Sequence, residues 1–185
     1  MSRPIDELPH EPEDQESVVN LLYGKKSPTF EQYKEMNNTY KLTCVCRIFE
    51  YNIFDILNEI IINESNRSII NKIILLAIKN CKIDILEFIK TNNKIIYSNN
   101  DQVNRVIIEC ETIEEVKKKI EIVEFLIKEF YYKFNDSFTA SCMKYGRKKY
   151  IEGKELWEIW IDISTELGYI HDKEVIEYGI KYKMY

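Results

Sequence analysis

Apolar residues recur three and four positions apart in short segments of this chain, and polar breaks separate those segments. This spacing places the apolar side chains on one face of an α-helix. In the first half of the chain, tight breaks at Asn52 and Cys81 alternate with longer polar loops. The segments that flank these two breaks are residues 39–50, 53–62, 68–80 and 82–90. The pattern therefore predicts antiparallel helix pairs, each joined by a tight turn.

The same order returns nearer the C-terminus, with tight breaks at Gly146 and Gly179. The segments that flank them are residues 137–145, 147–163, 173–178 and 180–185. Asparagine and glycine suit the positive φ that such a turn favours, whereas cysteine does not. One further unit, with its turn at Lys118, gives a mean spacing of about 32 residues, close to the repeat length of ankyrin proteins.

The first 38 residues read differently. Residues 1–13 are acidic and proline-rich and predict a flexible tail. Residues 14–38 predict an N-terminal helical cap: a short helix that ends at Gly24, and a second that begins at Ser27-Pro28. Residues 39–185 then form the predicted array of about four and a half helix pairs.

Composition favours an all-α fold. All four prolines lie in the first 28 residues, and the following 157 contain only four glycines, less turn punctuation than a β-rich fold needs. Hydrophobic residues make up 45% of the chain, which excludes a wholly disordered protein. No apolar run approaches the roughly 20 residues of a membrane span, and the start of the chain is unlike a signal peptide. We therefore expect a cytoplasmic protein with no membrane partner.

Three segments carry a family resemblance. Residues 77–86 (AIKNCKIDIL) resemble the helix–turn–helix core of an ankyrin repeat, in which a small residue precedes the turn and an acidic-apolar-apolar segment follows it. Residues 121–126 and 141–146 are similar to parts of the same core. With its Ile, Asn, Lys and Tyr bias, the chain looks like the divergent ankyrin-repeat proteins of large DNA viruses and AT-rich protists. The resemblance covers residues 39–185.

This resemblance implies a helical solenoid that acts as a non-enzymatic protein–protein interaction module, such as an adaptor or a host-factor binder. The family's Thr-Pro-Leu-His motif is absent from every unit, so the β-hairpin fingers are expected to be weak or absent. A different antiparallel helical array or bundle remains an alternative fold. A structural component of a larger assembly, such as a virion or a multiprotein complex, is the alternative function, and an all-α enzyme ranks third.

No reaction chemistry emerges from the residues. The five cysteines and two histidines provide no zinc-binding spacing, and the five scattered glycines cannot form a phosphate-binding loop. His171 adjoins Asp172, but no nucleophile lies in a recognisable context, and Asp172 is better explained as a helix N-cap. Residues 1–36 carry four basic and eight acidic side chains, and the rest is close to neutral, which disfavours nucleic-acid binding. We expect no catalytic, metal or cofactor site.

Two clusters are candidate contact surfaces for a protein partner of unknown identity. Tyr131, Tyr132 and Phe134 follow a helix and precede polar residues, and aromatic side chains dominate interface hot spots. Arg147, Lys148 and Lys149 follow a helix end and favour an electrostatic role. The repeat pattern places the first cluster at the loop edge of the array and the second at the turn edge.

Overall fold

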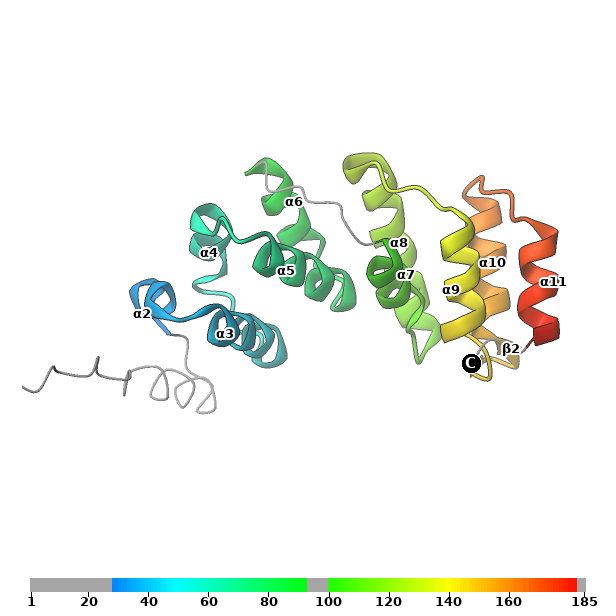
Figure 1. The fold of residues 1–185 in the computed structure, drawn as a ribbon, viewed down its shortest axis with the longest axis horizontal. Coiled ribbons are helices and arrows are strands. Elements are labelled where there is room, and N and C mark those ends of the chain that lie inside the picture. The colour runs from blue at the N-terminus through cyan, green and yellow to red at the C-terminus, as the bar shows by residue number, and fades with distance from the viewer. Residues whose placement is uncertain (1–27, 93–99, 183–185) are drawn as a thin grey trace, which may run out of the picture. The chain divides into compact units, whose positions relative to one another are not determined.

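The computed structural model describes residues 28–92 and 100–182 (Figure 1), and its described residues form ten helices and one two-stranded hairpin. The prediction of a mostly helical chain is thus confirmed. The predicted tail, residues 1–13, and the short helix that ends at Gly24 lie outside the described residues. The chain divides into two compact units, Met1–Ile69 and Ile70–Tyr185, with the boundary inside one helix.

The first unit contains α2 (Phe30–Glu35), α3 (Asn38–Tyr51) and α4 (Leu57–Asn63). Its core residues include Val45, Ile48, Leu57, Ile60 and Ile61, all at most 1% exposed. The buried Tyr33 hydroxyl donates a 2.8 Å hydrogen bond to the Glu64 carboxylate, and the Lys41 ammonium lies 3.6 Å from the same carboxylate. Burial raises the pKa of Glu64, but the hydrogen bond from the Asn66 amide (2.9 Å), together with the Tyr33 and Lys41 contacts, keeps that pKa below its usual range.

α2 begins two residues later than predicted. Its N-cap is Thr29, whose hydroxyl accepts from the Gln32 amide while the Gln32 side chain accepts from the Thr29 amide. This reciprocal pair is the capping box of the pattern Ser/Thr-x-x-Glu/Gln. Ser27-Pro28 therefore precedes the helix and does not begin it.

The second unit holds most of α5 (Arg67–Lys79), which crosses the boundary, and the rest of the fold. Its other helices are α6 (Ile83–Thr91), α7 (Asn100–Ile108), α8 (Ile113–Phe130), α9 (Asp136–Tyr145), α10 (Leu156–Glu166) and α11 (Lys173–Tyr182). α9 packs between α7 and α11, and α8 packs beside α6 (Figure 1). Trp160, Phe138 and Cys142 are fully buried where α9 and α10 meet.

The predicted turns at Asn52 and Cys81 are confirmed, and both residues adopt the left-handed conformation (φ 55° and 53°). After α5, the Lys82 amide donates to the Ala77 carbonyl (2.9 Å) and the Cys81 amide to the Ile78 carbonyl (3.2 Å). This bond pair is a Schellman motif, which normally has glycine where Cys81 stands.

Three other predicted boundaries are wrong. Lys118 lies inside α8, because the turn of this unit falls at residues 109–112, where Thr112 caps the helix. Gly179 lies inside α11, so no second helix begins there. The helix predicted to start at Arg147 begins at Leu156.

A hairpin precedes α10 in place of that helical turn. Strand β1 (Tyr150–Ile151) pairs antiparallel with β2 (Lys154–Glu155), and Ile151 faces Lys154. The two residues between them, Glu152 and Gly153, both have positive φ (51° and 81°). Positive φ at both central positions is the signature of a two-residue type I′ turn. The hairpin thus follows from Glu-Gly, a local signal that the helical pattern of residues 147–163 obscured.

Gly146 ends α9 at a negative φ (−93°), so its role is close packing and not a left-handed turn. A Cβ at this position would lie 2.6 Å from the Trp157 nitrogen and 2.8 Å from the Trp157 Cα, both backbone atoms. In α11, a Cβ at Gly179 would meet the Met143 side chain, at 2.8 Å. The two glycines therefore allow close approaches between neighbouring helices.

We expect Gly146→Ala to lower the free energy of unfolding by about 2 kcal/mol, because backbone atoms cannot move aside as a side chain can. Gly179→Ala is the matched comparison. Its Cβ meets a flexible methionine, and alanine favours a helix over glycine by about 1 kcal/mol. Urea unfolding of both variants measures the difference. An equal loss in both would contradict this account of Gly146.

Candidate functional site

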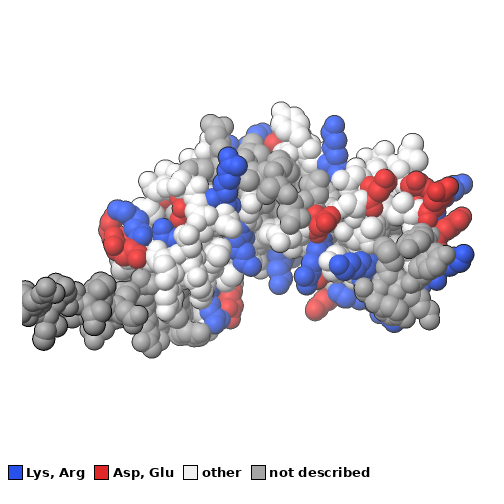
Figure 2. All heavy atoms as spheres, in the orientation of Figure 1, with Lys and Arg blue, Asp and Glu red and all other residues white. Residues whose placement is uncertain are grey.

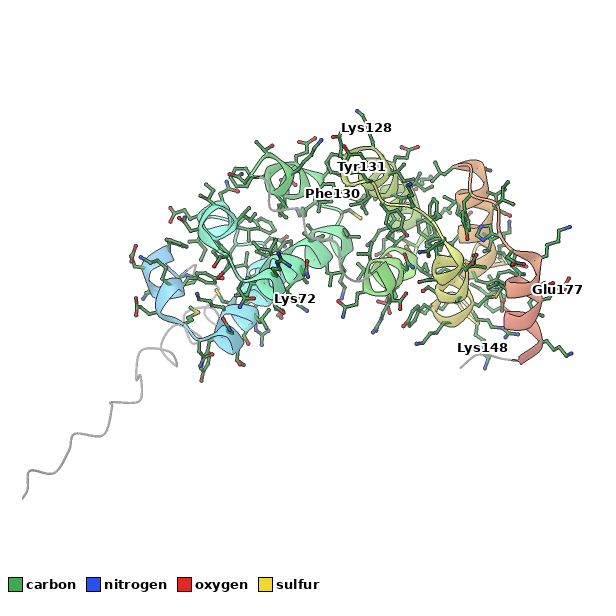
Figure 3. The ribbon with its side chains drawn as sticks, turned by 45° about the horizontal axis from the view of Figure 1, so that its top comes forward. Lys72, Lys128, Phe130, Tyr131, Lys148 and Glu177 are labelled. Carbon is green, nitrogen blue, oxygen red and sulfur yellow. The ribbon has the colours of Figure 1, made fainter. Side chains whose placement is uncertain are left out.

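The exposed aromatic residue at the end of α8 is Tyr131. Its side chain is 81% exposed, and its backbone is left-handed (φ 56°, ψ 27°) as it ends the helix. A residue with a Cβ adopts this conformation at a cost of roughly 1–2 kcal/mol, which glycine avoids. Tyr131 and Lys128 lie at the same end of α8 (Figure 3). A large apolar ring is thus held in solvent at a strained position.

The prediction that Tyr131, Tyr132 and Phe134 form an exposed contact surface is wrong for Tyr132, which lies in the core. Its side chain is 3% exposed, and its hydroxyl donates a 2.6 Å hydrogen bond to the Asn104 side-chain oxygen. Asn104 is itself buried and donates onward to Ser137. Phe134 is half-buried, and its ring contacts Tyr132 (centroids 5.5 Å apart). The backbone turns at Tyr131, so the Tyr132 side chain enters the core while the Tyr131 ring stays in solvent.

Replacing Tyr132 by Phe should lower the free energy of unfolding by about 1–2 kcal/mol, because Asn104 then loses a buried hydrogen-bond partner. Tyr131→Phe removes the same hydroxyl from an exposed ring and should change stability by less than about 0.5 kcal/mol. Chemical denaturation of the two variants provides the test. Similar stabilities would mean that the Tyr132 hydroxyl contributes nothing.

His171 joins three elements of the second unit. Its Nε2 lies 2.7 Å from the Ser164 hydroxyl of α10, and its Nδ1 lies 2.8 Å from the Thr139 hydroxyl of α9. Ser164 also donates to the Trp160 carbonyl (2.7 Å) and is fully buried. The arrangement is self-consistent with a neutral ring, in which Nε2 donates to Ser164 and Nδ1 accepts from Thr139. Asp172 caps α11 by accepting from the Glu174 amide (2.8 Å), as predicted.

The sequence did not reveal this contact between a serine and a histidine. Ser164 Oγ has no access to solvent, and a hydroxyl, not a carboxylate, faces the second ring nitrogen. A nucleophile must reach its substrate, and its base needs an orienting acceptor. The Thr139–His171–Ser164 contacts therefore connect helices and do not form a catalytic triad.

Burial lowers the pKa of His171 from its usual value of 6.5. The unfolded chain then binds more protons near and below that value than the folded chain does, so stability should fall as the pH drops through about 6.5. The slope for one group is at most about 1.4 kcal/mol per pH unit.

Urea unfolding across about pH 5.5–7.5, a window around the histidine pKa, should therefore give a flatter profile for His171→Gln than for the unchanged chain. His10, the other histidine, is present in both proteins and cancels in the comparison. Parallel profiles would exclude His171 as the group responsible.

The basic cluster follows α9, at the end opposite to Tyr131. Arg147 donates to the carbonyls of Gly179 (3.0 Å) and Ile180 (3.3 Å), so it caps the last turn of α11. Lys148 is exposed and left-handed (φ 61°), and Lys149 is exposed. The two predicted clusters thus lie at opposite ends of α9, as expected, but Arg147 has a structural partner.

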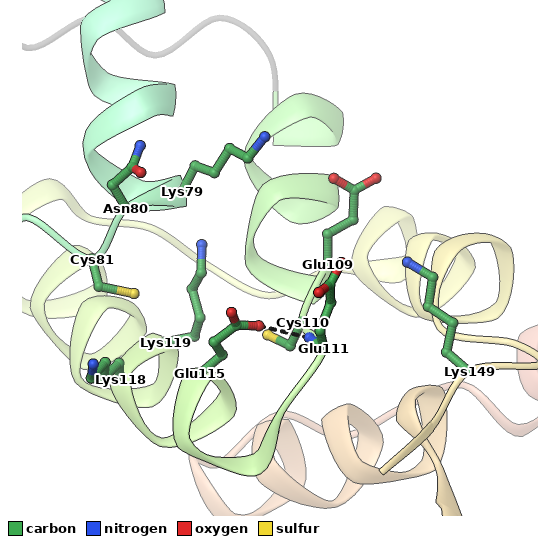
Figure 4. Close-up of a pocket in the computed structure, with 10 residues that line it drawn as sticks. All are labelled: Lys79, Asn80, Cys81, Glu109, Cys110, Glu111, Glu115, Lys118, Lys119 and Lys149. Atoms are coloured by element: carbon green, nitrogen blue, oxygen red, sulfur yellow. Dashed lines mark hydrogen bonds between the residues drawn. The ribbon is translucent and has the colours of Figure 1, made fainter. Parts of the chain in front are cut away.

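A cavity of about 430 Å³ lies at the turn end of the second unit, where three connections meet (Figure 4). These are the end of α5 with its turn, the connection from α7 to α8, and the segment after α9. Figure 2 shows Lys and Arg side chains, in blue, along the lower edge of this unit. The lining residues are Lys79, Asn80, Cys81, Glu109, Cys110, Glu111, Glu115, Lys118, Lys119 and Lys149.

Lys119 is the least expected of these residues, because it is 3% exposed in a run of lysines that reads as a solvated face. Its Nζ donates to the carbonyls of Ile78 (2.6 Å) and Val106 (2.9 Å), in the last turns of α5 and α7. Desolvation lowers its pKa below the usual value, although the neighbouring thiols and Glu115 oppose that shift. Its place in the buried stripe of α8, between Val116 and Val123, was the available signal.

Desolvation also shifts the pKa values of the buried cysteine thiols. It raises the pKa of Cys44 and of Cys110 to about 12, and that of the buried Cys142 well above 9.0. Thiols with raised pKa values are poor nucleophiles and poor metal ligands. Within residues 28–92 and 100–182, no group of three or more metal-ligating side chains occurs. No helix in this part of the chain is long and apolar enough to cross a bilayer.

Comparison with known proteins finds no matching family model, no matching curated protein and no matching solved structure. The ankyrin resemblance therefore stays a prediction drawn from the residues.

Proposed function

We propose that this chain is a non-enzymatic protein–protein interaction module built on an ankyrin-like array of helix pairs. The packing order in the second unit supports an array: the first helices of successive pairs, α7, α9 and α11, pack side by side, and so do the second helices α6 and α8. In a solenoid each unit contacts its neighbours in this way. The hairpin β1–β2 lies within the pair formed by α9 and α10 and does not join two pairs.

Tyr131 is the observation that carries the proposed interaction function. The residue is 81% exposed, so burial of the ring does not offset the energetic cost of the left-handed backbone. The left-handed backbone ends α8 and leads Tyr132 into the core, but no contact among the described residues requires a large aromatic ring at this exposed position. Tyrosine is also among the residues that contribute most to binding when a partner covers them. We therefore assign Tyr131 as a partner contact and keep Phe134, half-buried in the same loop, as a second candidate.

The exposed apolar residues favour an adaptor over a structural component of an assembly. A permanent subunit interface is large and apolar. Over the described residues, large exposed apolar side chains come one at a time from separate segments. They are Ile62, Tyr131, Tyr150, Ile170 and Ile180. Isolated contacts of this kind suit a reversible interaction better than an assembly interface.

The substitution Tyr131→Gly separates binding from folding. Glycine adopts the left-handed conformation without the cost that a Cβ brings, so the free energy of unfolding should rise by about 0.5–1 kcal/mol. Loss of the ring should weaken partner binding by more than about 2 kcal/mol if it is a hot spot. The measurements are urea unfolding and quantitative mass spectrometry of proteins captured from native host cells, followed by calorimetry with the captured partner.

Tyr150→Ala is the matched control, because Tyr150 is 65% exposed but lies on the hairpin at the turn end. Its capture profile should equal that of the unchanged chain. If Tyr131→Gly captures the same proteins with the same affinity, Tyr131 is not a contact. Turnover of a substrate by the purified chain would contradict the non-enzymatic assignment.

A further inference from the structure

The buried ammonium of Lys119 lacks a counter-ion among the described side chains. An ammonium has three N–H donors, and two of them bond the carbonyls of Ile78 and Val106. In residues 28–92 and 100–182, no carboxylate lies within 4.0 Å of this Nζ. Buried charges in proteins are normally paired, because desolvation of an isolated ion is costly. Lys119 lines the cavity at the turn end, so its third N–H donor is available to a ligand there.

Three more lysines surround the same cavity, and each comes from a different element. Lys79 ends α5, Lys118 lies in α8, and Lys149 follows α9 (Figure 4). None of the three forms an ion pair in the part of the chain that the structure describes. The positive charge of Lys79 also contributes to the lowered pKa of Lys119, so the two ammonium groups repel each other. An anion between them would remove that repulsion.

Two of the three carboxylates of the cavity wall accept hydrogen bonds from neighbouring residues. Glu109 accepts a 2.8 Å hydrogen bond from the Arg105 side chain, outside the cavity lining. Glu115 accepts a 2.7 Å bond from the Glu111 amide and so completes the start of α8. Glu111 is the remaining carboxylate and is exposed. The four lysines outnumber the three carboxylates of the wall by one, so the cavity lining carries a net positive charge.

We propose that this cavity binds the phosphoryl group of a small phosphorylated ligand, with Lys119 at its base and Lys79, Lys118 and Lys149 at its rim. A phosphoryl group carries close to two negative charges at neutral pH and three acceptor oxygens. A phosphoryl group can thus accept hydrogen bonds from several ammonium groups at once and offset more of their charge than a carboxylate, which carries one negative charge. Lysine is a common phosphate ligand in proteins. A volume of about 430 Å³ lies in the range of small-molecule sites.

This site is independent of the proposed protein interaction, since Tyr131 lies at the opposite end of the helices. Phosphoryl groups reach proteins as free phosphates or on a phosphorylated side chain. Calorimetric titration with pyrophosphate and with a short phosphoserine peptide, at constant ionic strength, distinguishes these two sources. Saturable binding of either probe to the full chain is expected, and the tighter probe identifies the source.

The variants test the lysines without disturbing the core. Lys79→Gln and Lys149→Gln alter exposed side chains and should each weaken binding about fivefold, because each removes one charge near the phosphoryl group. Glu111→Gln should tighten binding, since it removes a repelling charge. Lys128→Gln is the matched control: this lysine is 81% exposed at the loop end and should leave affinity unchanged.

The opposite signs of the lysine and glutamate variants separate a built site from general charge attraction. Non-saturating heats with both probes would overturn the proposal. So would an equal loss of affinity in Lys79→Gln and Lys128→Gln, which would indicate attraction to the overall surface charge. Lys119→Met completes the set: retained folding, verified by circular dichroism, with unchanged affinity would remove Lys119 from the site.

Discussion

The buried ammonium of Lys119 is the constraint around which the second unit is organised. The last carbonyls of a helix have no partner within the helix and need donors from elsewhere. Lys119 supplies donors to the ends of α5 and α7 at once, and it does so from the core side of α8. Its positive charge also suits the negative end of each helix dipole. This one side chain thus joins three helices, and it also lines the cavity beside their junction.

Left-handed residues at the helix ends set the directions of the chain. Asn52 and Cys81 close Schellman motifs that turn one helix back along the other, and Gly168 does the same after α10 (φ 91°). Cys81 shows that tertiary packing can hold a residue with a Cβ where glycine is the usual choice. Tyr131 occupies the same kind of position, and the exposure of its large aromatic ring is why we propose a contact role for it and a structural role for Cys81.

The two ends of the second unit consequently differ in chemistry. The loop end presents the exposed ring of Tyr131, and the hydrogen bonds of Tyr132 to Asn104 and of His171 to Thr139 lie in the same unit. The turn end presents lysines around a cavity, with Arg147 bonded to the end of α11. A protein partner at one end and a small anion at the other would not compete for the same side chains.

The sequence by itself determined the helical class, the turns at Asn52 and Cys81, the end of α9 at Gly146 and the cap at Asp172. These features depend on a few neighbouring residues, through hydrophobic period and backbone capping. It did not separate Tyr131 from Tyr132, because neighbouring residues of equal propensity differ only in the surface that each one meets.

Only the tertiary structure decided which polar residues enter the core. Lys117 pairs with Glu114 on the surface (2.9 Å), whereas Lys119, two positions later, is buried because it falls on the stripe that packs toward α5 and α7. Likewise, Gly179 lies inside α11 and does not end a helix, and its lack of a side chain lets α11 approach the Met143 side chain closely. Local patterns fix what each segment can form, and the contacts between distant segments determine which of its side chains are buried.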